Sequence, residues 1–240
     1  MPVYKLIDLP VFPAVEDAEP DGLLAIGGDL SVPRLIEAYS HGIFPWYSDD
    51  TPILWWSPDP RFVLFPDKLH VSKRMERVLK KGAFDIRFDT AFRDVITGCS
   101  NAPREGQDGT WIVPDMIEAY TALHEAGYAH SAEAWLDGEL VGGLYGVSLG
   151  ACFFGESMFA RVSDASKAAF ITLARKLGNA GFPMIDSQLH TNHLESLGAE
   201  HIPRTRYLEI LNANLGAQGL PGNWGKIFEQ LEKVKNSPPT

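Results

Sequence analysis

The sequence predicts an α+β fold, with a small N-terminal domain followed by a larger domain whose mixed sheet is flanked by helices. Residues 1 to about 60 are rich in proline, glycine and tryptophan, whereas residues 129–159 read as a three-strand meander. A long helical pattern follows the meander, and PMIDSQL after it can return as a strand parallel to the meander. We expect the domains to span 1–62 and 63–234, with a disordered tail at 235–240.

In the N-terminal part, one short helix is expected between Ser31 and Gly42, with Pro33 in its first turn. The next segment, GIFPWYSDDTPILWWSPDPRFVLFP, brings several tryptophans together among turn-forming residues. Tryptophan clusters usually belong to a core. The surrounding prolines leave a second interpretation, an aromatic platform at a surface.

The larger domain begins with a basic helix, after which FDIRFD predicts a strand and RDVITGC a short helix. VPDMIEAYTALHEAG predicts an amphipathic helix that ends at Gly127. Asp137-Gly138 and Ser148-Leu149-Gly150 are the hairpin signals of the meander. Ser163 or Asp164 caps the helix ASKAAFITLARKLGNAG, and SLGAEHIPRTRYLEIL adds a strand-like stretch and a helix.

Composition excludes several classes of protein. No stretch approaches the roughly 20 apolar residues of a membrane span, and the N-terminus lacks a signal-peptide pattern, so we expect a cytoplasmic protein. Cys99 and Cys152 show no CxxC spacing and predict structural thiols. A formal net charge of −10 argues against a general nucleic-acid binder.

The charge is unevenly spread. Residues 68–81 carry a net charge of +5, while the remainder carries −15. Ser72 can cap a helix that turns Met75, Val78 and Leu79 inward and gathers cations on its outer side. The candidate phosphate contacts are Lys73, Arg74, Arg77, Lys80 and Lys81. The alternative is an ordinary solvated helix face.

FFGESMF, residues 153–159, places Glu156 in a strand that otherwise looks buried. Strict alternation puts Phe154, Glu156 and Met158 on one face of the strand. A carboxylate among bulky apolar groups is typical of a pocket wall, and the alternative is an edge strand that turns Glu156 to water.

The order of meander, long helix, strand and final helix-strand region resembles that of GNAT-type N-acyltransferases. In that fold a glycine-rich turn at the start of the long helix holds the pyrophosphate of acyl-CoA. Here the turn reads RVSDASKAA, without a GxG or GxA pattern, and Asp164 opposes phosphate. We therefore expect the acyl group to arrive on another carrier.

The motifs GLLAIGGDL, GIFPWYS, PILWWSPDPR, EGQDGTWI, ELVGGLYGV, FFGESMF, DASKAAF, IDSQ and SLGAEHIPR closely resemble the bacterial leucyl/phenylalanyl-tRNA–protein transferase family. The resemblance runs from about residue 20 to 212. It implies transfer of leucine or phenylalanine, with methionine as a further candidate, from aminoacyl-tRNA to the N-terminal amine of proteins that begin with Arg or Lys. This transfer tags the acceptor for degradation.

The resemblance also implies site residues. Trp46 and Trp111 match the tryptophans that hold the terminal adenosine, where stacking needs no base-edge code. Asp186 and Gln188 match the family's catalytic pair, and their i, i+2 spacing predicts one strand face for both. Glu156 matches the glutamate of the family's GES motif. Our candidates for the aminoacyl side-chain wall, each with simple core as the alternative, are Leu144, Phe153, Met158 and Ile185.

The chemistry requires neither metal nor cofactor, because an aminoacyl ester is already activated. The attacking amine must be neutral, and Asp186, directly or through Gln188, is the expected proton acceptor. A positioning role for Asp186 is the alternative. His190 and His193 lie three residues apart, and without a third ligand at a suggestive spacing we interpret them as part of a polar loop.

Two other functions stay open on residues alone. One is a GNAT acetyltransferase that uses acetyl-CoA, which the missing glycine-rich turn disfavours. The other is a binder of tRNA ends without turnover, in which the same tryptophans and cations would serve.

Overall fold

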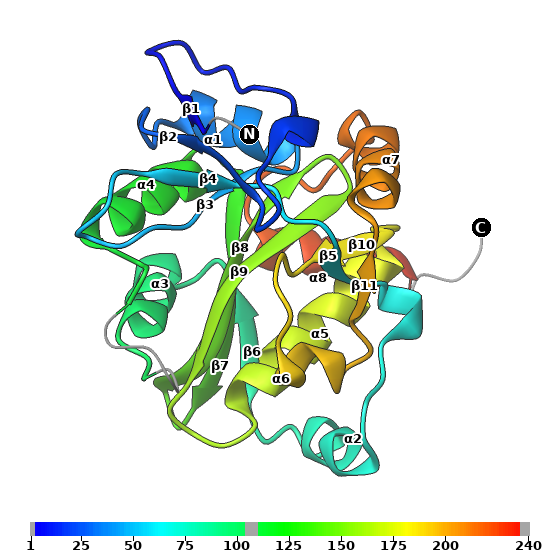
Figure 1. Ribbon diagram of the computed structural model, residues 1–240. Coiled ribbons are helices and arrows are strands. Elements are labelled where there is room, and N and C mark those ends of the chain that lie inside the picture. The colour runs from blue at the N-terminus through cyan, green and yellow to red at the C-terminus, as the bar shows by residue number, and fades with distance from the viewer. Residues whose placement is uncertain (1–2, 104–109, 236–240) are drawn as a thin grey trace.

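The structure is a computed structural model that describes residues 3–103 and 110–235. Its strands form two sheets, a small one near the N-terminus and a large one in the rest of the chain (Figure 1). Helices flank the large sheet, which confirms the predicted α+β class. The expected tail lies outside the described residues, except that Lys235 ends the last helix.

The small sheet is built from short strands around one helix. Its elements are β1 (Tyr4–Lys5), the 3₁₀ turn η1 (Val15–Asp17), β2 (Leu23–Ile26), α1 (Val32–Ser40), β3 (Phe44–Pro45) and β4 (Leu54–Trp56). The strand order is β1-β2-β4-β3, and only the β1–β2 pair is parallel. Trp55 on β4 is buried, and its indole nitrogen donates to the Gly27 carbonyl at 2.8 Å. Trp55 is therefore a core residue.

The large sheet contains the predicted meander. Its strands are β5 (Arg61–Leu64), β6 (Asp85–Phe88), β7 (Ala129–Leu136), β8 (Glu139–Leu149), β9 (Cys152–Ala160), β10 (Met184–Asp186) and β11 (Glu200–Ile202). They follow the order β11-β5-β10-β9-β8-β7-β6. β10 is parallel to β9 and the other neighbours are antiparallel, so the mixed sheet and the parallel return strand are confirmed.

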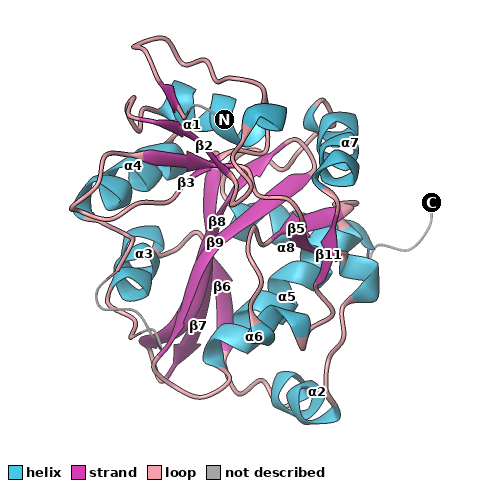
Figure 2. Cartoon of the chain, in the orientation of Figure 1, coloured by secondary structure: helices cyan, strands magenta, loops and turns pink. Residues whose placement is uncertain are grey.

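Helices cover both faces of the large sheet (Figure 2). They are the 3₁₀ turn η2 (Pro66–Lys68), α2 (Lys73–Lys80), α3 (Phe92–Ser100), α4 (Pro114–Glu125), α5 (Ala165–Asn179), α6 (Asn192–Glu195), α7 (Arg204–Leu215) and α8 (Trp224–Lys235). α3 and α4 share one core with the N-terminal sheet, and α5 and α8 share the other. α5 approaches the sheet closely, because a Cβ on Gly142 would lie 2.7 Å from that of Ala165.

The predicted boundary between residues 62 and 63 falls inside β5, which belongs to the large sheet. The two parts share a continuous apolar core, in which the rings of Tyr39 on α1 and Phe154 on β9 lie 5.1 Å apart. The division into 1–62 and 63–234 stays a prediction. Within the described residues, no helix combines the length and apolar character needed to cross a membrane.

Candidate active site

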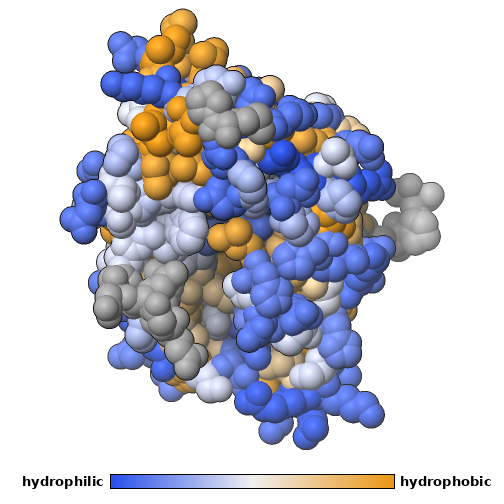
Figure 3. Space-filling view, in the orientation of Figure 1, coloured by the Kyte–Doolittle hydropathy of each residue, from blue (hydrophilic) through white to orange (hydrophobic). Residues whose placement is uncertain are grey.

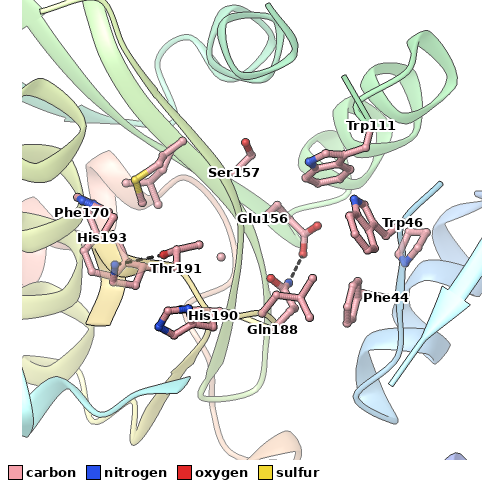
Figure 4. A pocket seen from close by; sticks show the side chains of 17 residues that line it. Phe44, Trp46, Trp111, Glu156, Ser157, Phe170, Gln188, His190, Thr191 and His193 are labelled. Atoms are coloured by element: carbon pink, nitrogen blue, oxygen red, sulfur yellow. Dashed lines mark hydrogen bonds between the residues drawn. The ribbon is translucent and has the colours of Figure 1, made fainter. Parts of the chain in front are cut away.

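A cavity of about 430 Å³ opens between the N-terminal domain and the large sheet. Its walls come from β3, β8, β9, α5 and the segment after β10. The surface is hollowed on this face of the molecule (Figure 3). Figure 4 shows Trp46 and Trp111 at one end, Phe170 and His193 at the other, and Glu156 with Gln188 between them.

Two predicted tryptophans face this cavity from irregular segments far apart in sequence. Trp46 follows β3, and its carbonyl accepts a 2.7 Å hydrogen bond from the Trp56 indole, whose ring packs against it at 5.7 Å. Trp111 lies just before α4. Residues 104–109 of the motif before Trp111 lie outside the described part of the chain. The structure thus brings both half-buried indoles to one end of the cavity.

Glu156 lies at an irregularity of β9, and this corrects the expected alternation. Tyr145 on β8 pairs with Ser157, whereas the next residue, Gly146, pairs with Gly155, so Glu156 is the extra residue of a β-bulge. The bulge reverses the faces beyond it. Met158 consequently packs in the core that holds Phe153, while Phe154 packs in the other, so Phe154 and Met158 lie on opposite faces.

The Glu156 carboxylate is half-buried and accepts hydrogen bonds from two side chains. Gln188 Nε2 donates to Oε1 at 2.8 Å, and the Tyr120 hydroxyl donates to Oε2 at 3.4 Å. The Tyr39 and Tyr120 hydroxyls meet at 2.5 Å. Burial raises the pKa of Glu156 to about 7, and the nearby Asp186 charge acts in the same direction, while the hydrogen bonds oppose it. Glu156 therefore changes charge close to neutral pH.

Asp186 does not line the cavity. Its side chain is 1% exposed and forms a two-point ion pair with Arg61, with Nε–Oδ1 at 2.9 Å and Nη2–Oδ2 at 2.7 Å. The Tyr207 hydroxyl donates to Oδ2 at 2.9 Å. The Arg61 guanidinium is held between the rings of Phe44 and Tyr207. Both Asp186 oxygens are thus engaged by buried donors.

Gln188 takes a different environment from Asp186, which corrects the expectation of one strand face for both. β10 ends at Asp186, and Gln188 beyond it has a φ of 54°, in the left-handed region. Its backbone N–H donates to Asp186 Oδ1 at 2.9 Å, and its carbonyl accepts from Phe62 N at 3.2 Å. Asp186 therefore fixes the backbone that directs the Gln188 amide toward Glu156.

The apolar wall is only partly as expected. Leu144 and Met158, opposite each other on β8 and β9, line the cavity. Phe153 and Ile185 do not; they are buried in the core behind it. Sequence reasoning missed Phe170 and Leu194, which complete the wall. Phe170 looks like any core position of α5, and only the topology turns it toward β9.

The basic helix forms as predicted, with the Ser72 hydroxyl accepting from Met75 N. Met75 is buried, Val78 and Leu79 are partly buried, and the five candidate cations are exposed. Arg74 pairs with Asp164 at the start of α5. α2 lies apart from the cavity, beyond α5 and α6 (Figure 1).

The histidine pair lines the cavity, and the ring of His190 stacks on that of His201, with centroids 5.7 Å apart. His190 approaches Glu195 at 3.3 Å, and burial lowers the pKa of His193. Among the described residues, no group of three His, Cys, Asp or Glu side chains could hold a metal ion.

Comparison with known proteins identifies the family. The model of the leucyl/phenylalanyl-tRNA protein transferase family matches residues 63–212, and that of its N-terminal domain matches residues 28–59. The chain belongs to the leucyl/phenylalanyl-tRNA protein transferase family. Members of this family are aminoacyltransferases that use charged tRNA, which confirms the resemblance in the motifs.

Curated relatives match over nearly their whole length. A leucyl/phenylalanyl-tRNA–protein transferase of Solidesulfovibrio magneticus is 57% identical, over 100% of this chain and 96% of the relative. One of Myxococcus xanthus is 56% identical, over 93% and 97%. A solved GCN5-related N-acetyltransferase of Kribbella flavida is 10% identical, with a TM-score of 0.34, and covers 70% of this chain and 59% of that one. This TM-score is too low to support an inference.

Proposed function

We propose that the cavity holds the aminoacylated adenosine of Leu-tRNA or Phe-tRNA, with Met-tRNA as a further donor. The amino acid passes to the N-terminal amine of a protein that begins with Arg or Lys, marking it for degradation. The observation that carries this proposal is the order of groups along one cavity: an aromatic end, a carboxylate–amide pair and an apolar recess.

The aromatic end suits the adenosine. Indole faces stack on any base, so Trp46 and Trp111 can hold the donor without reading tRNA sequence. The apolar recess suits the aminoacyl side chain. Leu144 offers branched aliphatic surface, Met158 an unbranched and adaptable side chain, and Phe170 an aromatic ring. Together they fit leucine, methionine and phenylalanine alike. The ester then lies between the two, beside Glu156.

Glu156 is the better candidate for the proton acceptor. The neutral amine attacks the ester carbonyl, a C–N bond forms, and the bond to the ribose oxygen breaks. Glu156 takes the proton from nitrogen and returns it to the ribose oxygen. A base with a pKa near neutrality suits both transfers. Gln188 donates to Glu156 through Nε2, and its Oε1 is an acceptor for an amine hydrogen.

We assign Asp186 to positioning. A carboxylate that receives Arg61, Tyr207 and the Gln188 N–H has no oxygen directed at the cavity. This favours the second of the two roles that the sequence leaves open. Asp186 keeps Gln188 in its left-handed conformation and thereby sets the direction of the amide.

The tRNA backbone meets α2 in this proposal. The five exposed cations on α2 and at its C-cap, Lys81, offer phosphate contacts at one place on an acidic protein. Recognition therefore involves the acceptor end and depends little on tRNA sequence. Charged tRNA is used where proteins are made, so we propose a cytoplasmic location.

The test follows labelled amino acid. The protein is incubated with an Arg-initiated acceptor protein and either [¹⁴C]Phe-tRNA or labelled acetyl-CoA. Label that moves from tRNA to the acceptor supports the proposal, and a matched acceptor that begins with Gly should stay unlabelled. Label from acetyl-CoA would indicate an acetyltransferase, and no label from either donor would indicate a binder of tRNA ends.

A further inference from the structure

The first turn of α5 links the cavity to the basic helix. Asp164, at the start of α5, pairs with Arg74 of α2. Phe170, six residues on, lines the cavity. Lys167 lies midway, three residues from each, and residues three apart share one side of a helix. Lys167 therefore lies on α5 between the cavity and α2. A single-stranded nucleic acid that runs from the cavity to α2 would pass it.

Lys167 has no counter-ion among the residues that the structure describes. The side chain is half-buried, and no hydrogen bond or ion pair joins it to another residue within 3–103 or 110–235. The other cations on α5 differ, because Arg175 pairs with Glu76 and Lys176 with Glu232. A partly desolvated ammonium without a counter-ion is costly unless an anion arrives.

The charge of Lys167 also acts on a residue that lines the cavity. His193 lines the cavity, and after burial, the positive charge of Lys167 is what lowers the pKa of this histidine. His193 belongs to α6, which follows the segment carrying Gln188. The charge thus acts at the end of the cavity away from the two tryptophans (Figure 4).

We infer that the Lys167 ammonium binds a phosphodiester of the single-stranded donor end, between the adenosine in the cavity and the phosphates that reach α2. Lys167 is a positioning residue in this inference, which rests on the proposed function. A phosphate oxygen would accept the charge-assisted hydrogen bonds of the ammonium, for which the described residues offer no acceptor. The contact carries no sequence information.

Donors of three lengths test this inference: Phe-tRNA, a Phe-charged CCA trinucleotide and Phe-adenosine, which has no phosphodiester. Lys167→Met should raise KM about tenfold for the first two and leave that for Phe-adenosine within about twofold. Lys167→Arg should restore most of the loss. The slope of log KM against log salt for the trinucleotide should fall by about 0.7 in Lys167→Met.

Two controls separate Lys167 from its surroundings. Lys176→Met removes a paired lysine from the same helix and should change no KM. Arg77→Ala with Lys80→Ala should affect Phe-tRNA only, because a trinucleotide is too short to reach α2. Equal losses with all three donors, or no loss with any, would overturn the inference while the proposed function stands. A parent protein that transfers no phenylalanine from tRNA would overturn the proposed function and the inference together.

Discussion

Asp186 and Gln188 lie two residues apart, and their side chains have different partners. Asp186 is buried against Arg61, whereas Gln188 reaches the cavity and donates to Glu156. The hydrogen bond from the Gln188 N–H to Asp186 joins the two. A change at Asp186 therefore acts on the chemistry through Gln188.

Replacement of Asp186 by asparagine and by alanine separates positioning from base catalysis. Asn keeps an oxygen for the Gln188 N–H, so Asp186→Asn should retain kcat within about tenfold of the parent, whereas Asp186→Ala should lose at least tenfold more. KM for charged tRNA should change little in either. Both variants should be less stable, by about 3 to 5 kcal/mol, because Arg61 stays buried without its partner. Rates are therefore measured below the unfolding transition; equal loss of kcat in both would make Asp186 the base.

Residue identities at the site could be read from sequence motifs, but their partners could not. Arg61 is 125 positions away from Asp186, and no local pattern predicts that β5 and β10 would pair. The sequence therefore left the role of Asp186 open. The same holds for Tyr39 and Tyr120, which look like core tyrosines until α1 and α4 bring their hydroxyls to Glu156.

Among the elements, the bulge in β9 and the two irregular tryptophan segments shape the cavity. The hairpins of the meander follow from local turn residues, with Asp137 and Gly138 both at positive φ. The bulge follows from no turn signal. Strict alternation consequently predicted the wrong face for Met158, while the long helix and the parallel return strand were confirmed.

The two tryptophan segments should contribute separately to donor binding. Trp46→Ala and Trp111→Ala should each weaken use of Phe-tRNA by about 1 to 3 kcal/mol, measured as KM, because each removes a stacking face. Trp135→Ala, on β7, is the matched control and should leave KM unchanged. Parent-like KM in both cavity variants would assign these indoles to the core.

The basic helix should determine how binding depends on salt. Arg77→Ala with Lys80→Ala should lower the slope of log affinity for tRNA against log salt by up to about two units, because two phosphate contacts are lost. The measurement is tRNA affinity at a series of salt concentrations between about 50 and 200 mM. The control is Lys5→Ala with Arg206→Ala, which removes the same charge outside α2 and should not alter the slope. An unaltered slope in the α2 variant would favour a solvated helix face.

For the whole molecule, the ionised Glu156 that the proposed reaction needs lowers the stability of the native state. Its pKa is 4.5 in an unperturbed chain and about 7 in the fold, so its ionisation destabilises the native state as pH rises through this window. The shift corresponds to on the order of 2 to 3 kcal/mol for a half-buried group.

Glu156→Gln should therefore be more stable than the parent at pH 8, and this advantage should shrink toward pH 5, where the parent carboxyl is protonated. Denaturant unfolding at several pH values measures the difference. The exposed Glu139→Gln is the control and should show no such trend. A stability difference that does not vary with pH would contradict a raised pKa for Glu156.

The most direct test of the account is the rate of single-turnover transfer from Phe-tRNA to an Arg-initiated protein as a function of pH. In the parent, the rate should rise with pH through about 7, as Glu156 ionises, and further near 8, as the acceptor amine loses its proton. In Glu156→Gln the rate should fall about 10²-fold and keep only the rise near 8. A Gln variant with the parent's rate and pH profile would contradict the assignment of Glu156 as the group that takes the amine proton.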